Sequence, residues 1–379
     1  MRLSIHPKWL MSLASRVNAA LAAVNVQFVR KTGLERLRLL EQEFQDLLSD
    51  YQSLKARHER LSDRLHLPEA FFDLYPNQSL NLPEGAEYLL IPSNTRLTDL
   101  TQRYRAINHP VMLASMWTDT FVQQEIDLYR FRADGGYVWQ HREINTDLHY
   151  ALCTYYLKTI DTLGLFDRLP EDNWFGAYTV LVDQRPVSRD LLDSMTEIYF
   201  LERHLGLSQC TNFHLLDIGA GYGRFAHRLV QALPNFGKVF CTDAIATSSF
   251  LCEYYLKFRG VEQAAIAVPF DELPKTLAKY PVQLAINMHS FSECSIEAIA
   301  GWLELLAEFH IPYLMLVPNA LDNGGTQLLS FEKDQSRADY QPLLEKYGYQ
   351  KVASEPKFRD PIVQANGISP THYYLFKRE

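Results

Sequence analysis

One segment in the second half of the chain reads Phe213-His-Leu-Leu-Asp-Ile-Gly-Ala-Gly-Tyr-Gly-Arg224. Its apolar first half, residues 213–218, predicts a buried strand. The three glycines that follow at alternate positions predict a tight turn in which the backbone can approach a ligand, and a helix is expected over residues 222–233. This order of strand, glycine turn and helix is typical of domains that bind a mononucleotide-type cofactor.

Beyond the glycine turn, short β-rich runs alternate with amphipathic helices. Further strands are expected at 238–242, 264–268, 282–287 and 313–317, and helices at 247–259, 271–279, 295–309 and 340–347. This rhythm predicts an α/β fold with a Rossmann-like, doubly wound and mostly parallel sheet that binds ligands at the carboxyl ends of its strands. Two strand-like runs, at 351–358 and 372–377, are expected to add an antiparallel edge.

Residues 1–33 are predicted to form a basic amphipathic helix. They carry five Lys and Arg side chains and no acid, interleaved with apolar residues at helical spacing. Such a helix fits peripheral contact with the anionic inner face of a membrane, and it fits docking on the body of the protein equally well. The pattern does not separate these two interpretations.

Residues 34–67 are predicted to form a coiled coil. From Leu37 to Leu65 the apolar positions alternate in steps of three and four residues, and charged residues fill most of the remaining positions. This pattern predicts a homo-oligomer held together by the coiled coil. The alternative is an amphipathic helix that packs within its own chain.

The rest of the chain is expected to form two further regions. Residues 68–205 are predicted to be a mainly helical substrate and lid region, with helices over 145–163 and 188–205 and Ser188 as the N-cap of the second. Residues 206–379 are predicted to be the cofactor-binding catalytic domain.

Composition narrows the class of protein. The chain has 379 residues, of which 47% are apolar and 22% charged, as in an ordinary globular protein. Its net charge of −8 offers no broad basic surface, so nucleic acid is not expected as a partner. Five cysteines without paired spacing suggest neither a disulfide framework nor a zinc site, and no apolar run is long enough to span a membrane. A cytoplasmic protein is expected.

Two charged residues of the glycine segment indicate which cofactor it would take. A dinucleotide fingerprint requires a small residue at position 224, where Arg224 stands, so NAD is disfavoured. Asp217 at the end of the strand would repel a pyrophosphate and attract an ammonium or a sulfonium. These features favour S-adenosylmethionine. The plain alternative is a tight glycine turn without a ligand, followed by Asp243 as a helix cap.

The glycine segment resembles the cofactor motif of class I methyltransferases. Further segments resemble a family of sugar O-methyltransferases found with bacterial polysaccharide genes: Gly136-Tyr-Val-Trp-Gln140, 188–194, Asp243-Ala-Ile245, Tyr254-Tyr-Leu256, Ile286-Asn-Met-His-Ser-Phe-Ser-Glu293 and Val317-Pro-Asn319. The resemblance runs from about residue 134 to the C-terminus. It departs at Cys294, where the family would have Met, and residues 1 to about 130 match nothing. It implies methyl transfer to the hydroxyl of a sugar, within a nucleotide sugar or a growing glycan.

The resemblance also implies roles for particular residues. The expected cofactor-binding residues are Asp217, Gly219, Gly221, Gly223, Asp243, Phe270, Asp271 and Asn287, with Asp243 on the ribose hydroxyls and Phe270 and Asp271 near the adenine. The expected substrate-binding residues are Tyr137, Trp139, Ser194 and Glu197. Each aromatic residue here could equally belong to the core, and Asp271 could equally cap a helix.

His289 and Glu293 are the candidate catalytic residues. His289 follows the fourth expected strand, beside the expected ligand crevice, and an imidazole suits a general base that takes the proton of a sugar hydroxyl. Glu293 would lie on the same face as His289 if this segment is helical, and would then orient it. The alternative is a histidine bonded to local backbone. Glu293 and Glu297 are too few carboxylates for a divalent metal, so no metal is expected.

Two other functions compete with sugar O-methylation. The first is methylation of another small-molecule hydroxyl or amine, because the residues specify the cofactor better than the acceptor. The second is a non-catalytic scaffold in which the coiled coil assembles a complex and the Rossmann-like domain only senses the cofactor. Cofactor binding and turnover with a panel of acceptors would separate these functions.

Overall fold

The computed structural model describes residues 81–133, 135–137, 146–320 and 323–379. The chain divides into two compact units, Met1–Pro76 and Asn77–Glu379, and the described residues belong to the second. The expected basic helix, the expected coiled coil and Trp139 therefore lie outside the described residues. Oligomerisation and membrane contact stay predictions.

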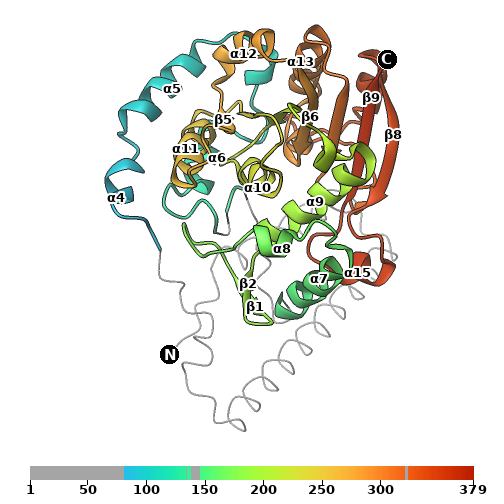
Figure 1. Cartoon of the computed structure of the whole chain (residues 1–379). Coiled ribbons are helices and arrows are strands. Elements are labelled where there is room, and N and C mark those ends of the chain that lie inside the picture. The colour runs from blue at the N-terminus through green and yellow to red at the C-terminus, as the bar shows by residue number, and fades with distance from the viewer. Residues whose placement is uncertain (1–80, 134, 138–145, 321–322) are drawn as a thin grey trace, which may run out of the picture. The chain divides into compact units, whose positions relative to one another are not determined.

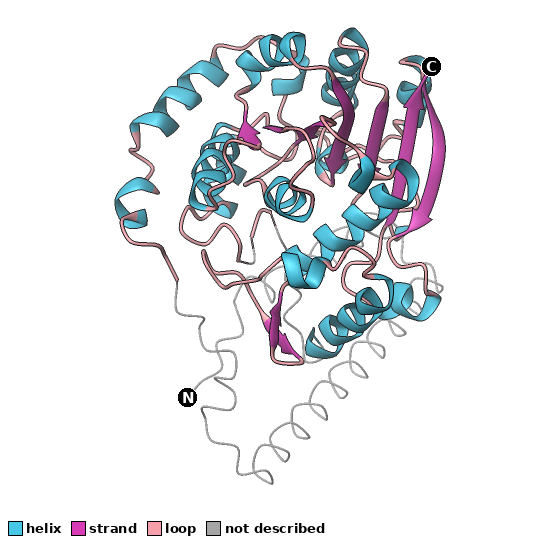
Figure 2. Cartoon of the chain, in the orientation of Figure 1, coloured by secondary structure: helices cyan, strands magenta, loops and turns pink. Residues whose placement is uncertain are grey.

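A seven-stranded sheet forms the centre of the described unit (Figures 1 and 2), in the order β5-β4-β3-β6-β7-β9-β8. Its strands are β3 His214–Ile218, β4 Val239–Thr242, β5 Ala265–Ala267, β6 Val282–Met288, β7 Tyr313–Val317, β8 Tyr349–Pro356 and β9 His372–Arg378. The first five strands in this order are parallel, and β9 runs antiparallel to both β7 and β8. The predicted Rossmann-like, mostly parallel sheet with an antiparallel edge is confirmed.

Helices cover both faces of the sheet. The α-helices of the described residues are α4 Ala86–Leu89, α5 Thr95–Arg105, α6 Asp119–Glu125, α7 Thr146–Ile160, α8 Leu165–Arg168, α9 Arg189–Leu205, α10 Arg224–Ala232, α11 Ala246–Phe258, α12 Leu273–Lys279, α13 Ile296–Glu308, α14 Gln341–Lys346 and α15 Pro361–Asn366. A small hairpin, β1 Val180–Val182 and β2 Arg185–Val187, lies outside the sheet. Among the described helices, none is long and apolar enough to cross a membrane.

Alternating side chains of the strands build two cores. Leu215 of β3 packs into a core with α7, α9 and α10, whereas Leu216 packs into the core on the other face with α5, α11 and α13. The two central strands β3 and β6 are covered on both faces, which explains their continuous apolar runs. The helices that precede the sheet in the chain thus share its cores.

One expected helix differs in detail, and another is confirmed together with its cap. The helix predicted over 271–279 is divided into a 3₁₀ turn, Phe270–Glu272, and α12, because Pro274 lacks the amide hydrogen needed inside a helix and suits its first turn. The helix expected over 188–205 forms as α9, and Ser188 caps it by accepting from the Leu191 amide.

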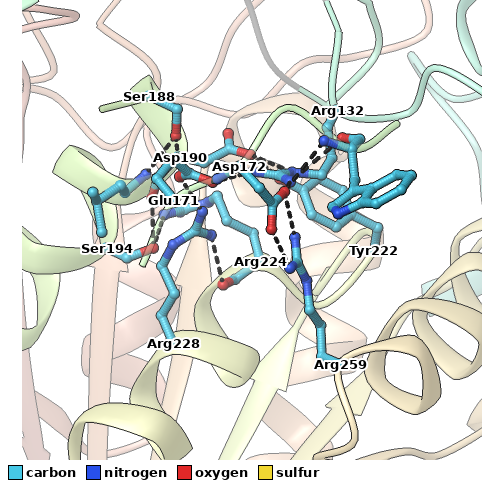
Figure 3. A network of polar contacts seen from close by, with 12 residues as sticks. Arg132, Glu171, Asp172, Ser188, Asp190, Ser194, Tyr222, Arg224, Arg228 and Arg259 are labelled. Carbon is cyan, nitrogen blue, oxygen red and sulfur yellow. Dashed lines mark hydrogen bonds and ion pairs between the residues drawn. The ribbon is translucent and has the colours of Figure 1, made fainter. Parts of the chain in front are cut away.

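Buried charges join the segment before residue 134 to α9. Arg132 is fully buried and donates to three carboxylates: Glu171 at 2.7 Å, Asp172 at 2.7 Å and Asp190 at 3.2 Å (Figure 3). Such a group is stable in the interior only when its charge and its hydrogen-bond donors are all satisfied.

The same carboxylates also bind residues of the sheet-covering helices. Arg228 of α10 donates to Glu171 at 2.6 Å, and Arg259, just after α11, donates to Asp172 at 3.0 Å. Nearby cations hold the pKa of Glu171 well below its usual range although burial opposes this. We call these residues, Arg132, Glu171, Asp172, Asp190, Arg228 and Arg259, the buried charge network.

Removing Arg132 should leave the buried Asp190 without an ion-pair partner among the described residues, and Glu171 and Asp172 with one cation each. We therefore expect Arg132→Met to lower the free energy of unfolding by about 3–5 kcal/mol in urea denaturation. The matched control is Arg105→Met, which removes an exposed ion pair with Asp119 and should cost about 1 kcal/mol or less. Equal effects of the two substitutions would contradict a structural role for the buried charge network.

Candidate functional site

A cavity of about 160 Å³ lies at the carboxyl ends of the parallel strands. Its walls come from the glycine turn after β3, the residues after β4, the end of β6 and two segments from before the sheet, 111–117 and 135–137. We call the segment 111–117 the strap. The cavity therefore lies where a doubly wound sheet is expected to bind its ligand.

The glycine turn needs its glycines for space as well as for backbone conformation. Gly219 and Gly221 have φ of 68° and 56°, in the left-handed region that favours glycine. A Cβ on Gly219 would lie 2.2 Å from the Ser290 hydroxyl oxygen, and one on Gly221 would lie 3.0 Å from the Tyr137 ring. The turn thus packs closely against the end of β6 and against the segment 135–137.

Asp217, at the end of β3, faces the cavity as an unsatisfied charge. Only 3% of the residue is exposed, and its carboxylate makes no hydrogen bond or ion pair with any residue that the structure describes. Burial raises the pKa of Asp217 to about 7, although the nearby Arg224 lowers it. A cationic ligand group next to this carboxylate would remove the cost of its burial.

Asp243 follows the end of β4 and lines the same cavity. Its two carboxylate oxygens accept from the amides of Gly221 at 3.1 Å and Ile245 at 2.9 Å, which fixes the orientation of the side chain. Burial raises the pKa of Asp243 to about 7 as well. Each oxygen keeps a lone pair, so the carboxylate can accept hydrogen bonds from ligand hydroxyls.

His289 follows β6 and lines the cavity in a strained conformation. Its φ is 67°, which is rare for a residue other than glycine, and its amide donates to the Val317 carbonyl at 2.7 Å. Its Nδ1 atom is buried and has no partner among the described residues. Burial, helped by the nearby Arg189, lowers the pKa of His289 to about 3, so the imidazole is neutral and can accept a hydrogen bond.

Glu293 lines the cavity but its described partners do not include His289. The residues 290–293 form a 3₁₀ turn, and the Glu293 carboxylate accepts from Trp117 Nε1 at 2.7 Å and Asn319 Nδ2 at 3.0 Å. Ser115 also donates to the Glu293 carbonyl at 2.9 Å. Glu293 therefore fastens the strap to the end of β6 instead of orienting the imidazole as expected.

The strap is the part of the site that the sequence did not reveal. Residues 68–205 were expected to form a mainly helical substrate and lid region, and no role was assigned to the strap within it. The place of the strap depends on contacts such as that of Trp117 with Glu293, which are 176 residues apart in the chain. Nothing in the local pattern of residues 111–117 could have predicted this contact.

Tyr137, which was expected to bind substrate, lies over the glycine turn. Its ring contacts the Gly221 backbone and stacks on Trp117 with centroids 6.1 Å apart, and its hydroxyl shares a hydrogen bond with Ser248 at 2.9 Å. Tyr137 is thus placed beside the expected cofactor.

Asn287 does not line the cavity, but its hydrogen bonds fix the position of the segments that do. Its side-chain amide nitrogen donates to the Ile218 carbonyl at 3.0 Å, and its oxygen accepts from the Phe291 amide at 2.9 Å. Only 1% of the residue is exposed. It therefore holds the end of β6 against the glycine turn and has no donor left for a ligand.

Phe270 and Asp271, which were expected near adenine, do not line the cavity. Phe270 packs edge-on against Trp302, with ring centroids 5.3 Å apart, and Trp302 lines the cavity in its place. Asp271 is exposed and accepts two hydrogen bonds from Arg103 at 2.7 and 2.9 Å. The 168 residues between Asp271 and Arg103 explain why this pairing was not predicted.

Ser194 and Glu197 are buried in α9 and hold Arg224 in place. Arg224 Nη1 donates to Ser194 at 2.9 Å, and both Nη atoms donate to Glu197 at 2.8 Å. Ser194 and Glu197 are 0% and 1% exposed, and residues 190–201 are buried without a break. The lid role expected of α9 stays a prediction. In this structure Glu197 supplies Arg224 with a buried counter-charge.

Three further observations concern the last glycine of the turn, metal binding and the polar groups of the cavity wall. Gly223, with φ of 86°, begins α10 and packs against Cys252 and Leu256 of α11. Within the described residues, no three His, Cys, Asp or Glu side chains gather in a way that could hold a metal ion. The groups that line the cavity thus include the carboxylates of Asp217, Asp243 and Glu293, the neutral imidazole of His289 and the guanidinium of Arg224.

Comparisons with known proteins give no family for this chain. No family model and no curated protein matches it. Among solved structures it is similar to magnesium protoporphyrin IX methyltransferase from Synechocystis PCC 6803, at 13% identity and a TM-score of 0.35, over 60% of this chain and 97% of the other. It is also similar to precorrin-6y C5,15-methyltransferase from Geobacter metallireducens GS-15, at 13% identity and a TM-score of 0.32, over 53% and 93%.

A third similar structure is a SAM-dependent methyltransferase from Aquifex aeolicus, at 15% identity and a TM-score of 0.33, over 48% of this chain and 88% of the other. Similarity of this size assigns neither a substrate nor an activity to this chain.

The burial of the Asp217 carboxylate should make the free energy of unfolding of the ligand-free protein depend on pH. Because the pKa of Asp217 is raised on folding, the free energy of unfolding should fall as pH rises toward 7. Asp217→Asn removes this titration. We expect the variant to gain about 2–3 kcal/mol relative to the wild type between pH 5 and pH 8 in urea denaturation, at 1.36 kcal/mol per pKa unit.

The matched control is Asp119→Asn, whose side chain is 82% exposed. This exposed substitution should change the free energy of unfolding by about 1 kcal/mol or less. A constant difference for Asp217→Asn would contradict the environment assigned to this carboxylate.

Proposed function

We propose that this chain is an S-adenosylmethionine-dependent methyltransferase. The observation that carries the proposal is the Asp217 carboxylate, which is buried in the cavity beside the glycine turn and has no partner among the residues that the structure describes. A ligand with an ammonium group would neutralise it, whereas a pyrophosphate would be repelled. The amino-acid end of S-adenosylmethionine supplies such an ammonium.

The second carboxylate fits the same ligand. Asp243 is oriented by the amides of Gly221 and Ile245 and offers lone pairs to the cavity. Vicinal hydroxyls of a ribose are donors that such a fixed carboxylate can accept. Asp217 belongs to β3 and Asp243 follows the neighbouring strand β4, so one nucleoside with a cationic substituent could contact both carboxylates in the same cavity.

We propose a sugar hydroxyl as the methyl acceptor, in a nucleotide sugar or a surface glycan. Support comes from the resemblance of residues 286–293 and 317–319 to sugar O-methyltransferases, and from His289. Bound S-adenosylmethionine supplies a methyl group on a positively charged sulfur. His289 Nδ1 would accept a hydrogen bond from the acceptor hydroxyl and take its proton as the new bond between carbon and oxygen forms.

Cofactor binding should depend on Asp217 and on pH. We expect Asp217→Ala to weaken binding of S-adenosylmethionine and S-adenosylhomocysteine about tenfold or more in calorimetric titration, because it removes a charge-assisted hydrogen bond. Wild-type affinity for S-adenosylhomocysteine should fall about tenfold from pH 8 to pH 6, because protonation with a pKa of about 7 removes the charge of Asp217.

The control for this titration is Asp119→Ala, which should bind both ligands as the wild type does. If the folded wild-type protein binds neither ligand, the proposed function is wrong, and a scaffold role becomes the leading interpretation.

The acceptor is tested by turnover with a panel of sugars, nucleotide sugars, phenols and amines. We expect methylation of a sugar hydroxyl. We expect His289→Gln to lower kcat about 10²-fold or more while cofactor affinity changes little, because the base acts on the acceptor. Turnover with phenols or amines alone would replace the sugar proposal, and an unchanged kcat would remove His289 from the mechanism.

A further inference from the structure

A second cavity lies beside the cavity that Asp217 lines. Its volume is about 430 Å³, and its walls come from α5, the strap, α6 and the start of α11. Neither Asp217, Asp243 nor His289 lines it. The cofactor and the proposed base therefore leave this second cavity without a role.

The wall of the second cavity is largely apolar. Leu97 of α5, Met112 of the strap and Ile245 before α11 are among the side chains that line it. Among the described residues of the wall, only Arg105 and Asp119 are charged, and they pair with each other at 3.1 Å. Their side chains are 68% and 82% exposed, so this ion pair lies at the solvent-facing rim. The wall offers a ligand an apolar surface and a charge pair that is already neutralised.

Helix α6 presents an apolar face to this cavity. Val122 and, directly after the helix, Ile126 are four residues apart, lie on the same face and line the cavity. Both are partly exposed, and no residue of α6 is buried. A helix is normally held in a fold by burial of its apolar face, so a ligand that covers Val122 and Ile126 would stabilise α6.

The second cavity adjoins the first. The two share five wall residues, three of the strap and two that follow β4: Met112, Ala114, Trp117, Ala244 and Ile245. Trp117 also donates to Glu293, which lies on the same turn as His289. The strap is therefore the partition between the two cavities.

The size of the first cavity indicates what the second one is for. A cavity of about 150 Å³ holds a molecule the size of benzene. The first cavity, at about 160 Å³, cannot hold a nucleoside cofactor together with its acceptor. Ligand sites usually measure about 300–1,000 Å³, a range that the second cavity reaches at about 430 Å³.

We propose that the second cavity binds an uncharged, apolar group of the methyl acceptor. The acceptor is then a glycoside with an apolar aglycone, whose sugar lies at His289 and whose aglycone lies against α5 and α6. The inference rests on the proposed function, in which a sugar hydroxyl receives the methyl group. It narrows the acceptor to one of the classes which that function leaves open.

The same wall disfavours a nucleotide sugar. Its diphosphate would bring two negative charges into the second cavity, where the cation of the described wall, Arg105, is already paired with Asp119. Anions that leave water without a counter-charge pay a large desolvation cost. An alkyl or aryl group has no such cost and gains free energy from the apolar wall.

Three probes with the same sugar separate these acceptors: methyl β-D-glucoside, hexyl β-D-glucoside and uridine diphosphate glucose. Each is titrated calorimetrically at pH 8 into the full-length protein saturated with S-adenosylhomocysteine, so that the nucleoside position is filled. We expect hexyl glucoside to bind at least tenfold more tightly than methyl glucoside, because its additional methylenes leave water. We expect uridine diphosphate glucose to gain less than threefold over methyl glucoside.

Two variants of α6 locate the binding of the hexyl group. Val122→Asp places a carboxylate in the second cavity, and Gln124→Asp places one at an exposed position of the same helix that does not line it. We expect Val122→Asp to weaken hexyl glucoside at least tenfold and Gln124→Asp less than twofold. Both variants should bind S-adenosylhomocysteine as the wild type does, which shows that they are folded.

Several results overturn the inference and leave the proposed function intact. These are no binding of hexyl glucoside, equal affinities for the hexyl and methyl glucosides, tighter binding of uridine diphosphate glucose than of hexyl glucoside, or equal effects of the two α6 variants. The comparison of the three probes needs no variant, so it decides the question even if Val122→Asp does not fold. Failure of the wild type to bind S-adenosylhomocysteine overturns the proposed function itself.

Discussion

The site depends on one electrostatic constraint: Asp217 is buried at the end of the central strand without a hydrogen-bond or ion-pair partner among the described residues. A cation stands nearby in Arg224, and in most interiors the two would pair. Here Glu197 accepts from both Nη atoms of Arg224, and Asp217 in the same cavity forms no ion pair with the guanidinium. The cost of this arrangement is a carboxylate whose pKa rises to about 7, and a ligand that brings its own cation would remove that cost.

Two sets of contacts hold this constraint in place. The buried charge network fixes α9, which carries Glu197, against α10, which begins at Arg224. Tyr222 extends this connection to the glycine turn itself, because its hydroxyl donates to Asp190 while its ring lines the cavity. On the other side, Glu293 fastens the strap over the cavity through Trp117. Local geometry of the site is thus tied to packing between distant segments.

The sequence predicted well what depends on neighbouring residues. The strands and the cap at Ser188 follow from local apolar patterns and capping chemistry, and the glycine turn with Asp217 and Asp243 was placed at the cavity from its motif. The sequence did not predict contacts between side chains that are far apart in the chain. Asp271 pairs with Arg103, and Glu197 pairs with Arg224, so neither is free for the role expected of it. A sequence motif predicts the region of the fold in which a residue lies. Which partner its side chain contacts depends on the packing of segments that are far apart in the chain.

The most direct test of the central claim is the number of protons released when S-adenosylhomocysteine binds at pH 7, measured calorimetrically in buffers of different ionisation enthalpy. With a pKa of about 7, Asp217 is half protonated before binding and must ionise to receive the ammonium, so about half a proton should be released per ligand bound. Asp217→Asn should release correspondingly less. Binding without proton release, or with equal release in the variant, would contradict the claim that the Asp217 carboxylate ionises when it binds the cationic group of the ligand.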